Sequence, residues 1–155
     1  MVIIRPNKSF DYERCADLEW ITGKIVKIEE RLNKNRRYKD QETGEYKIRE
    51  VEEMRFVFEL EGYKFPHRSR YMTKSVAEKS NLYSKYLKEL IPGLQPNQAV
   101  DLEQLIGKSV KTMWDTEKGK DGKDYQHIKI IKPLDPITPE EIVVPDVDLP
   151  EGAPF

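Results

Sequence analysis

Apolar and charged positions alternate most clearly between residues 54 and 60. There Met54, Phe56, Phe58 and Leu60 are separated by Arg55, Val57 and Glu59. Successive side chains of a β-strand point to opposite faces of a sheet, so this pattern predicts a strand with one face in a core.

A second pattern, over residues 105–133, predicts a β-hairpin. Two apolar-bearing runs, 109–115 and 125–131, flank a connection that contains Gly119, Asp121 and Gly122. Asp-Gly pairs accept the positive φ that tight hairpin turns require. We therefore expect two paired antiparallel strands with an exposed tip.

The side chains near this tip are aromatic and basic. We expect Trp114 and Tyr125 to face each other near the mouth of the hairpin, with Lys118, Lys120 and Lys123 at its tip. Aromatic rings beside cations suit the bases and phosphates of a nucleic acid. Alternatively, Trp114 covers one end of the core and the lysines only protect an edge strand.

Three further strand features precede a helix. Residues 18–32 predict a strand that bends near Gly23, because its apolar positions change phase there. Residues 33–49 predict a second hairpin tip centred on residues 42–44. Residues 63–73 predict a third strand, with Pro66 at an edge or a bulge.

The pattern does not decide which face of this third strand is buried. If Tyr63, Phe65 and Tyr71 lie in the core, then Lys64, Arg68 and Arg70 are exposed, whereas a bulge at Pro66 mixes the two sets.

The pattern changes to a helical period after residue 75. Ser75 and Glu78 form a capping-box pattern, with Ser80 as an alternative start. An apolar stripe follows at three- and four-residue spacing, and consists of Tyr83, Tyr86, Leu87, Leu90 and Ile91. We expect the two tyrosines to pack against the core, and residues 101–106 to form one or two further helical turns.

The order strand, strand, strand, helix, strand, strand is typical of the OB-fold. We therefore predict a mainly β protein with one helix, folded as a five-stranded barrel over residues 18–133, after a lead-in of residues 1–17. OB-folds bind oligonucleotides or oligosaccharides on strands 2 and 3 and on the loops between strands 1 and 2 and between strands 4 and 5. In this chain those loops are residues 33–49 and 116–124, and both carry cations and aromatic rings.

Charge is distributed unevenly along a chain whose formal net charge is only −1. Residues 133–155 hold six of the 28 acidic residues and none of the 27 Lys and Arg residues, so residues 1–132 carry 27 − 22 = +5. Residues 134–155 are also rich in proline. We expect them to form an extended acidic tail.

Length and cysteine content limit the class of protein. With 155 residues, 37% of them hydrophobic, the chain suits one domain. Its single cysteine, Cys15, cannot form an intrachain disulfide and fits a reducing compartment. No signal-peptide core or membrane-length apolar run is evident, so we expect a cytoplasmic protein without a membrane partner.

The sequence offers no arrangement suited to catalysis. Neighbouring acids such as Glu29 and Glu30, or Glu52 and Glu53, point to opposite faces of a strand and cannot share a metal. His67 and His127 stand alone, and no zinc-type spacing or phosphate-binding loop occurs. We expect no enzymatic activity, no metal and no cofactor.

In element order over residues 18–133, and in its end PDVDLPEGAPF, the chain resembles bacterial and phage single-stranded DNA-binding proteins. The resemblance implies binding of single-stranded DNA without strong sequence preference, and a homo-oligomer is possible. It also implies a tail that recruits replication and repair enzymes through Asp146, Asp148, Pro154 and Phe155. Gly152 and Ala153 depart from the family pattern, in which an acid and an aliphatic residue are usual.

From these features we predict a nucleic-acid-binding surface made of two kinds of residue. The expected phosphate contacts are Arg36, Arg37, Arg68, Arg70, Lys118, Lys120 and Lys123, and the expected stacking residues are Tyr38, Tyr46, Trp114 and Tyr125. RNA remains an alternative ligand. The alternative function is a protein-interaction or accessory module of a phage or mobile-element complex, which would show an apolar exposed face.

Overall fold

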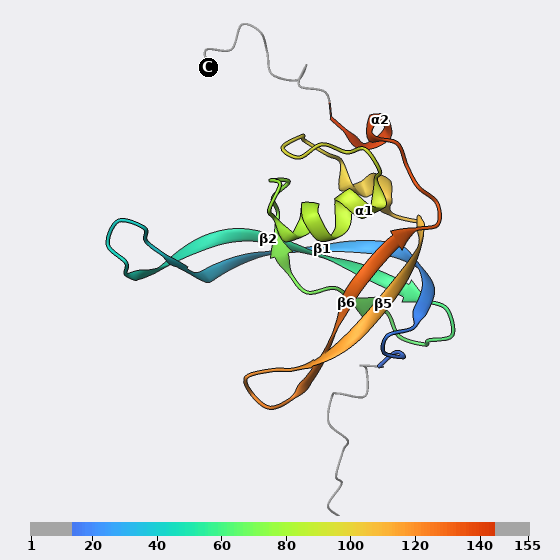
Figure 1. Ribbon diagram of the computed structural model, residues 1–155, viewed down its shortest axis with the longest axis horizontal. Coiled ribbons are helices and arrows are strands. Elements are labelled where there is room, and N and C mark those ends of the chain that lie inside the picture. Colours follow the sequence, from blue (N-terminus) through green and yellow to red (C-terminus); the bar gives the residue numbers. More distant parts are fainter. Residues whose placement is uncertain (1–13, 145–155) are drawn as a thin grey trace, which may run out of the picture.

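A computed structural model of the chain describes residues 14–144, and it is mainly β (Figure 1). Its strands are β1 (Trp20–Lys39), β2 (Tyr46–Leu60), β3 (His67–Arg68), β4 (Met72–Thr73), β5 (Ser109–Lys118) and β6 (Asp124–Pro133). They form one antiparallel sheet in the order β3-β2-β1-β5-β6, and β4 also pairs with β2.

The two longest strands, β1 and β2, form a ribbon whose inner face carries the predicted alternation. Met54, Phe56 and Phe58 are fully buried, as is Ile25 opposite Phe58. The change of phase in β1 is confirmed as a register shift between Ile25 and Lys27. The predicted loop 33–49 is wrong, however, because strand pairing continues to Lys39 and Tyr46.

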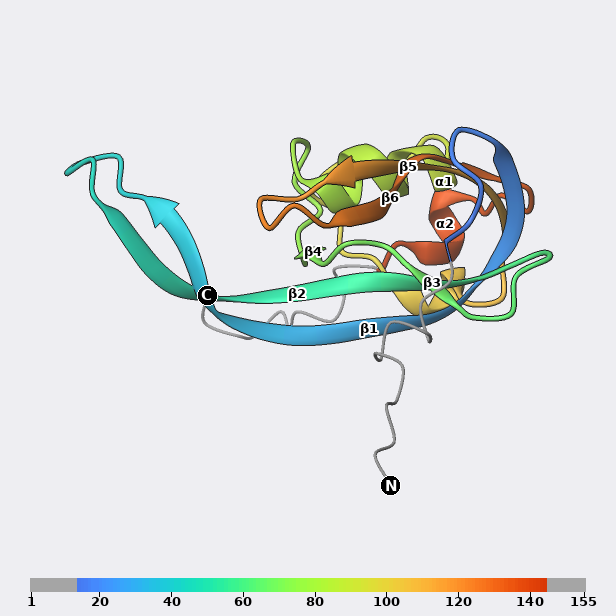
Figure 2. The same ribbon diagram turned by 90° about the horizontal axis from the view of Figure 1, so that it is seen from below.

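Only residues 40–45 form the turn of this hairpin. The Gly44 N–H donates to the Asp40 carbonyl over 2.8 Å, and Gly44 has a φ of +73°, a conformation that glycine adopts without strain. Beyond the body of the protein, the β1–β2 ribbon therefore projects as a two-stranded arm (Figures 1 and 2).

The hairpin of β5 and β6 confirms the strands predicted within residues 105–133, although both strands extend further towards the tip. The expected approach of Trp114 and Tyr125 is wrong, because the register places Trp114 opposite Ile128 and Tyr125 opposite Glu117. The β1–β2 arm and the β5–β6 tip point away from the body at separate places, so they do not close on each other (Figure 1).

The third predicted strand is broken into the two short strands β3 and β4. His67, Ser69 and Met72 are buried, whereas Arg68 and Arg70 are exposed. Tyr63, Phe65 and Tyr71 are only half-buried. The exposed residues Lys64, Arg68 and Arg70 are therefore those of the first alternative, but the three aromatic rings are not fully buried in the core.

The helix begins after Ser80, the later of the two predicted starts. A π-helical segment, η2 (Leu82–Leu87), continues into α1 (Lys88–Leu90), and the Ser80 Oγ accepts a hydrogen bond from the Tyr83 N–H over 3.2 Å. The predicted stripe is buried, including Tyr83 and Tyr86. The short helix η3 (Leu102–Leu105) matches the helical turns expected at residues 101–106.

The sheet is not closed into the expected five-stranded barrel. Within residues 14–144, β6 pairs only with β5, and β3 and β4 pair only with β2. A side-chain contact spans the gap instead: Arg70, which follows β3, lies 2.7 Å from Glu117 of β5. Such an exposed ion pair adds little stability and does not replace strand pairing. The sheet is therefore open on this side.

The body of the protein also extends past residue 133, where the tail was expected to begin. A short helix, α2 (Pro139–Ile142), follows, and Ile137 and Ile142 are buried in the core. Val143 forms a β-bridge with Val100. At the other end, Cys15 is buried in the core as well. The tail residues Asp146, Asp148, Pro154 and Phe155 lie outside the described residues.

Trp114 belongs to the core and is not available for stacking on bases. Its exposed fraction is 1%, its ring meets Phe58 edge to face at 6.0 Å, and its Nε1 donates to the Thr112 Oγ1 over 2.8 Å. The prediction of Trp114 as a stacking residue is therefore wrong. Its place on the inward face of β5, directly opposite the apolar Ile128, explains the burial.

We expect Trp114→Ala to lower the free energy of unfolding by about 3–5 kcal/mol, because it removes a fully buried aromatic side chain. Urea denaturation followed by circular dichroism measures the change. The control is Trp20→Ala, since Trp20 is 46% exposed, and its effect should stay within about 1 kcal/mol. Equal losses in the two variants would contradict the core assignment.

Candidate functional site

Cations gather on the outer face of the β1–β2 ribbon. Cross-strand partners share a face, so the pairs Arg31 with Glu53 and Arg36 with Arg49 lie on one side, away from Phe56 and the core. We call the cations of this face between the Lys27–Val57 pair and the turn the arginine band; they are Lys27, Arg31, Arg36, Lys47, Arg49, Arg55 and, beside Val57, Arg68. Three acids lie among them, Glu29, Asp40 and Glu53, so the band carries 7 − 3 = +4.

Glu53 organises the centre of the band. Its carboxylate accepts hydrogen bonds from Arg31 Nε at 2.8 Å and from Arg36 Nη1 at 2.9 Å, and its side chain is only 2% exposed. Burial by itself would raise the pKa of this carboxyl, but Arg31, Asn33 and Arg36 outweigh it and hold the pKa below its ordinary value. Glu53 therefore fixes two cations that reach solvent.

Glu29 holds two further arginines of the band, Arg55 and Arg68, in place. It accepts hydrogen bonds from Arg55 Nε at 2.8 Å and from Arg68 Nε at 3.2 Å. Burial by itself would raise the pKa of the Glu29 carboxyl. The two guanidinium groups outweigh this effect and hold the pKa below its ordinary value, so Glu29 stays ionised. Each of these two acids thus holds two arginines, and the surplus of positive charge remains.

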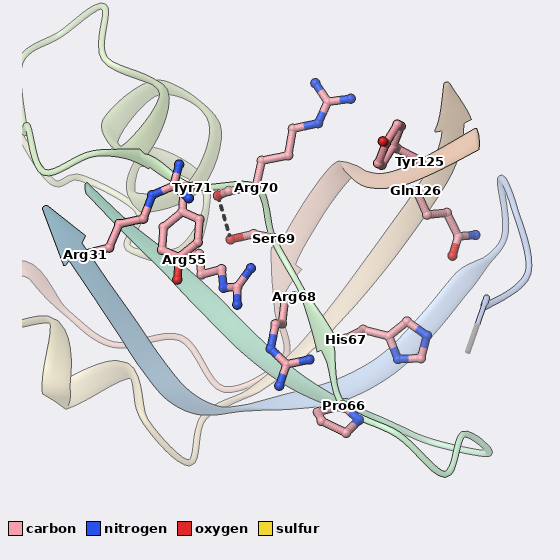
Figure 3. Close-up of a pocket in the computed structure, with 10 residues that line it drawn as sticks. All are labelled: Arg31, Arg55, Pro66, His67, Arg68, Ser69, Arg70, Tyr71, Tyr125 and Gln126. Carbon is pink, nitrogen blue, oxygen red and sulfur yellow. Dashed lines mark hydrogen bonds between the residues drawn. The ribbon is translucent and has the colours of Figure 1, made fainter. Parts of the chain in front are cut away.

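Tyr71 is the aromatic residue in the middle of this cluster. The Arg31 Cζ lies 3.7 Å from the centre of its ring and the Arg55 Cζ lies 4.3 Å from it (Figure 3). Both distances suit cation–π contacts. Because these guanidinium groups occupy its ring, Tyr71 supports the arginines and does not offer a free stacking surface.

A groove of about 690 Å³ opens beside the band. Arg31 and Arg55 come from β1 and β2, the segment of residues 66–71 adds Arg68 and Arg70, and Tyr125 with Gln126 lines the opposite side from β6 (Figure 3). The groove lies where the sheet fails to close. It therefore combines a cationic wall with an aromatic residue, Tyr125, that is 47% exposed.

The structure brings several of the predicted site residues to this surface. Arg36 and Arg68 belong to the band, and Arg70 and Tyr125 line the groove. Tyr38 lies on the band face of the arm, with the Arg49 Cζ 5.1 Å from its ring centre.

Other predicted residues lie elsewhere. Arg37 and Tyr46 share the opposite face of the arm, 5.4 Å apart from guanidinium carbon to ring centre. The lysines at positions 118, 120 and 123 are exposed at the β5–β6 tip, but Glu117, Asp121 and Asp124 balance their charge. The Tyr125 hydroxyl donates a hydrogen bond to the Asp121 carboxylate. The tip therefore has no excess of positive charge.

Sequence reasoning missed Arg31, Arg49, Arg55 and Tyr71. A signal existed, because Arg49, Glu53 and Arg55 stand at even spacing in one strand. The assignment of residues 33–49 to a loop separated Arg49 from this strand, since a loop has no defined face.

Comparison with known proteins returned no match to a protein-family model, to a curated protein or to a solved structure. Among residues 14–144, no cluster of three His, Cys, Asp or Glu side chains is placed to hold a metal ion. The same part of the chain has no helix long and apolar enough to cross a lipid bilayer.

We expect Glu53→Gln to lower the free energy of unfolding by about 2 kcal/mol at neutral pH, because the amide cannot keep both charge-assisted hydrogen bonds. The folded pKa of Glu53 lies below its ordinary value of 4.5, so ionised Glu53 stabilises the fold above that pH and this stabilisation is lost as the pH falls below it. Urea denaturation between about pH 7 and about pH 3 should show a smaller acid-dependent loss in Glu53→Gln than in the wild type.

Glu52→Gln is the matched control, because Glu52 is the neighbouring carboxylate and its side chain is 73% exposed. Its acid dependence should follow that of the wild type. If Glu53→Gln loses as much stability on acidification as the wild type does, Glu53 is not the carboxylate that fixes the band.

Proposed function

We propose that the protein binds single-stranded nucleic acid, with DNA as the expected ligand, and with little sequence preference. The observation that carries the proposal is the arginine band, whose seven cations outnumber three acids on one continuous face and end at an open groove. A phosphate backbone that follows the band would meet positive charge along its whole path.

Two kinds of interaction would supply the affinity, charge neutralisation and base stacking. The cations of the band neutralise phosphates and release condensed counterions, which makes binding dependent on salt. Exposed rings add stacking energy that every base provides, at about 1–3 kcal/mol per base. Tyr125 at the groove is suitably exposed, and Tyr38 lies beside Arg49 on the band face. Neither term distinguishes strongly between bases.

The order of strand pairing supports the same function. β1 pairs with both β2 and β5, β5 pairs with β6, and the helix lies between β4 and β5 in the chain. We interpret this as an OB-fold in which the strands that would close the barrel, β3 and β6, do not pair. The groove then occupies the side on which OB-folds bind oligonucleotides, next to strands 2 and 3.

The proposal differs from the surface that the sequence predicted on the two loops 33–49 and 116–124. The β5–β6 tip has balanced charge, so its lysines are not assigned to the binding surface. Arg36 and Tyr38 keep their predicted roles, and Arg31, Arg49 and Arg55 join them. The tail of residues 145–155 keeps the partner-recruiting role that the resemblance implies, as a separate proposal.

We expect Arg49→Gln combined with Arg68→Gln to weaken binding of a fluorescein-labelled dT oligomer by about tenfold or more, because two phosphate contacts are lost. Fluorescence anisotropy at a series of salt concentrations measures this. The slope of log affinity against log salt should become shallower by about 1.4, the value for two contacts to a single strand.

Lys88→Gln is the matched control, since Lys88 is an exposed cation on α1, which covers the inner face of the ribbon (Figure 2). It should bind as the wild type does. If the wild type fails to bind a long dT strand at low salt, the nucleic-acid proposal fails and the alternative of a protein-interaction module takes its place.

A further inference from the structure

Trp20, at the start of β1, is an exposed tryptophan. Its exposed fraction is 46%, whereas the other tryptophan of the chain, Trp114, is buried in the core. Tryptophan is highly buried on average in folded proteins, because its ring is large and mostly apolar. Tryptophan is also enriched at interfaces, where a partner covers the ring. Trp20 is therefore a candidate for contact with a ligand.

The alternation of side chains along β1 places Trp20 on the outer face of the sheet. Ile21 and Ile25 are buried in the core, so Trp20 and Lys24 point to the other side. The register shift after Ile25 preserves this arrangement, because Lys27 lies on the outer face beyond it. Trp20 therefore lies on the strand face that carries the arginine band, and β1 curves between the two (Figure 2).

The surface between the band and Trp20 is hollowed. A groove of about 460 Å³ opens at one end of the band, and its lining includes Lys27 and Glu59. A smaller hollow of about 180 Å³ is lined in part by Thr22, Lys24 and Glu59. Because Glu59 lines both hollows, they are neighbours. Together they lead from the band along β1 towards Trp20.

Charge on this part of the outer face is balanced, in contrast to the band. Lys24 lies opposite Glu59, and Lys111 shares a face of β5 with Asp115. A phosphate would therefore gain little here, whereas a flat aromatic ligand could stack on the indole ring. A nucleobase is the flat ligand that a single strand supplies at every position.

One cation lies against the Trp20 ring. The Lys111 Nζ is 4.7 Å from the ring centre, a distance that suits a cation–π contact. Among residues 14–144, no second cation and no other aromatic ring contacts the indole. Trp20 thus differs from Tyr71, whose ring two guanidinium groups occupy. The indole is positioned by one lysine and keeps exposed area for a base.

We propose that Trp20 is a stacking platform for a base of the same strand that the arginine band binds. This inference rests on the proposed function and adds a second point of contact to it. Trp20 and Lys27 are seven residues apart along β1, or about 23 Å at about 3.3 Å per residue. A stacked strand rises about 3.4 Å per nucleotide, so about seven nucleotides reach from one to the other.

Intrinsic fluorescence tests the proposal, because the chain has two tryptophans and Trp114 is only 1% exposed. The titrant is unlabelled dT of about 20 nucleotides, longer than the usual site of about 4–16 nucleotides on one OB-fold. We expect it to quench the tryptophan emission of the wild type in step with binding measured by anisotropy. In Trp20→Phe the remaining emission comes from Trp114 and should not change, although the strand still binds.

Affinity provides a second measurement. Trp20→Ala should weaken binding of the labelled dT oligomer by about tenfold, because one stacked base is lost. The slope of log affinity against log salt should stay unchanged, since stacking releases no counterions. Trp20→Phe should recover part of the lost affinity, because a phenyl ring still stacks. Urea denaturation confirms that both variants fold.

Tyr46→Ala is the matched control. Tyr46 is another exposed aromatic residue beside a cation, with the Arg37 Cζ 5.4 Å from its ring centre, but it lies on the face of the arm opposite the band. Its removal should leave dT binding unchanged. A loss equal to that of Trp20→Ala would contradict a platform specific to Trp20.

The outcomes separate this inference from the proposed function. If the wild type binds dT but shows no quenching, and Trp20→Ala binds equally well, the platform is overturned and the proposed function stands. Quenching that persists in Trp20→Phe also overturns the platform, because the signal then comes from Trp114. If the wild type does not bind dT at low salt, both fail.

Discussion

Backbone pairing between β1 and β2 is the constraint on which the rest of the molecule depends. The pairing runs from Gly23 and Leu60 at the body to Lys39 and Tyr46 near the turn, with two register shifts. The first shift, after Ile25, keeps Ile28 on the core side opposite Phe56. A slip by one residue would expose every core side chain of a strand and bury its charges, so the apolar face fixes the register.

The same register determines the chemistry of the outer face. It brings Arg31 and Arg36 to one buried carboxylate, Glu53, and Arg55 to Glu29. Several guanidinium groups at close range would repel one another without these acids. With them, the arginines are held in defined places while the face keeps its positive charge, which is the condition for preorganised binding of an anion.

Particular residues show how far the sequence could predict the fold and the site. The alternation at Met54, Phe56 and Phe58 predicted a strand correctly, because a buried face imposes a period of two. Trp114 was ambiguous between core and ligand contact, since an aromatic ring beside cations suits both; only its packing against Phe58 decides. Arg31, Arg55 and Tyr71 were not predicted as residues of the site. They come from three segments, and their meeting depends on non-local pairing.

The sequence alone therefore determined the identity and order of the main elements, the uneven charge along the chain and the buried stripe of the helix. These are local properties, set by periodicity, turn residues and composition. The tertiary structure decided that the sheet stays open, that residues 134–144 pack on the core, and that the cations of β1 and β2 share one face. Those outcomes depend on register and on contacts between distant segments, which no local pattern specifies.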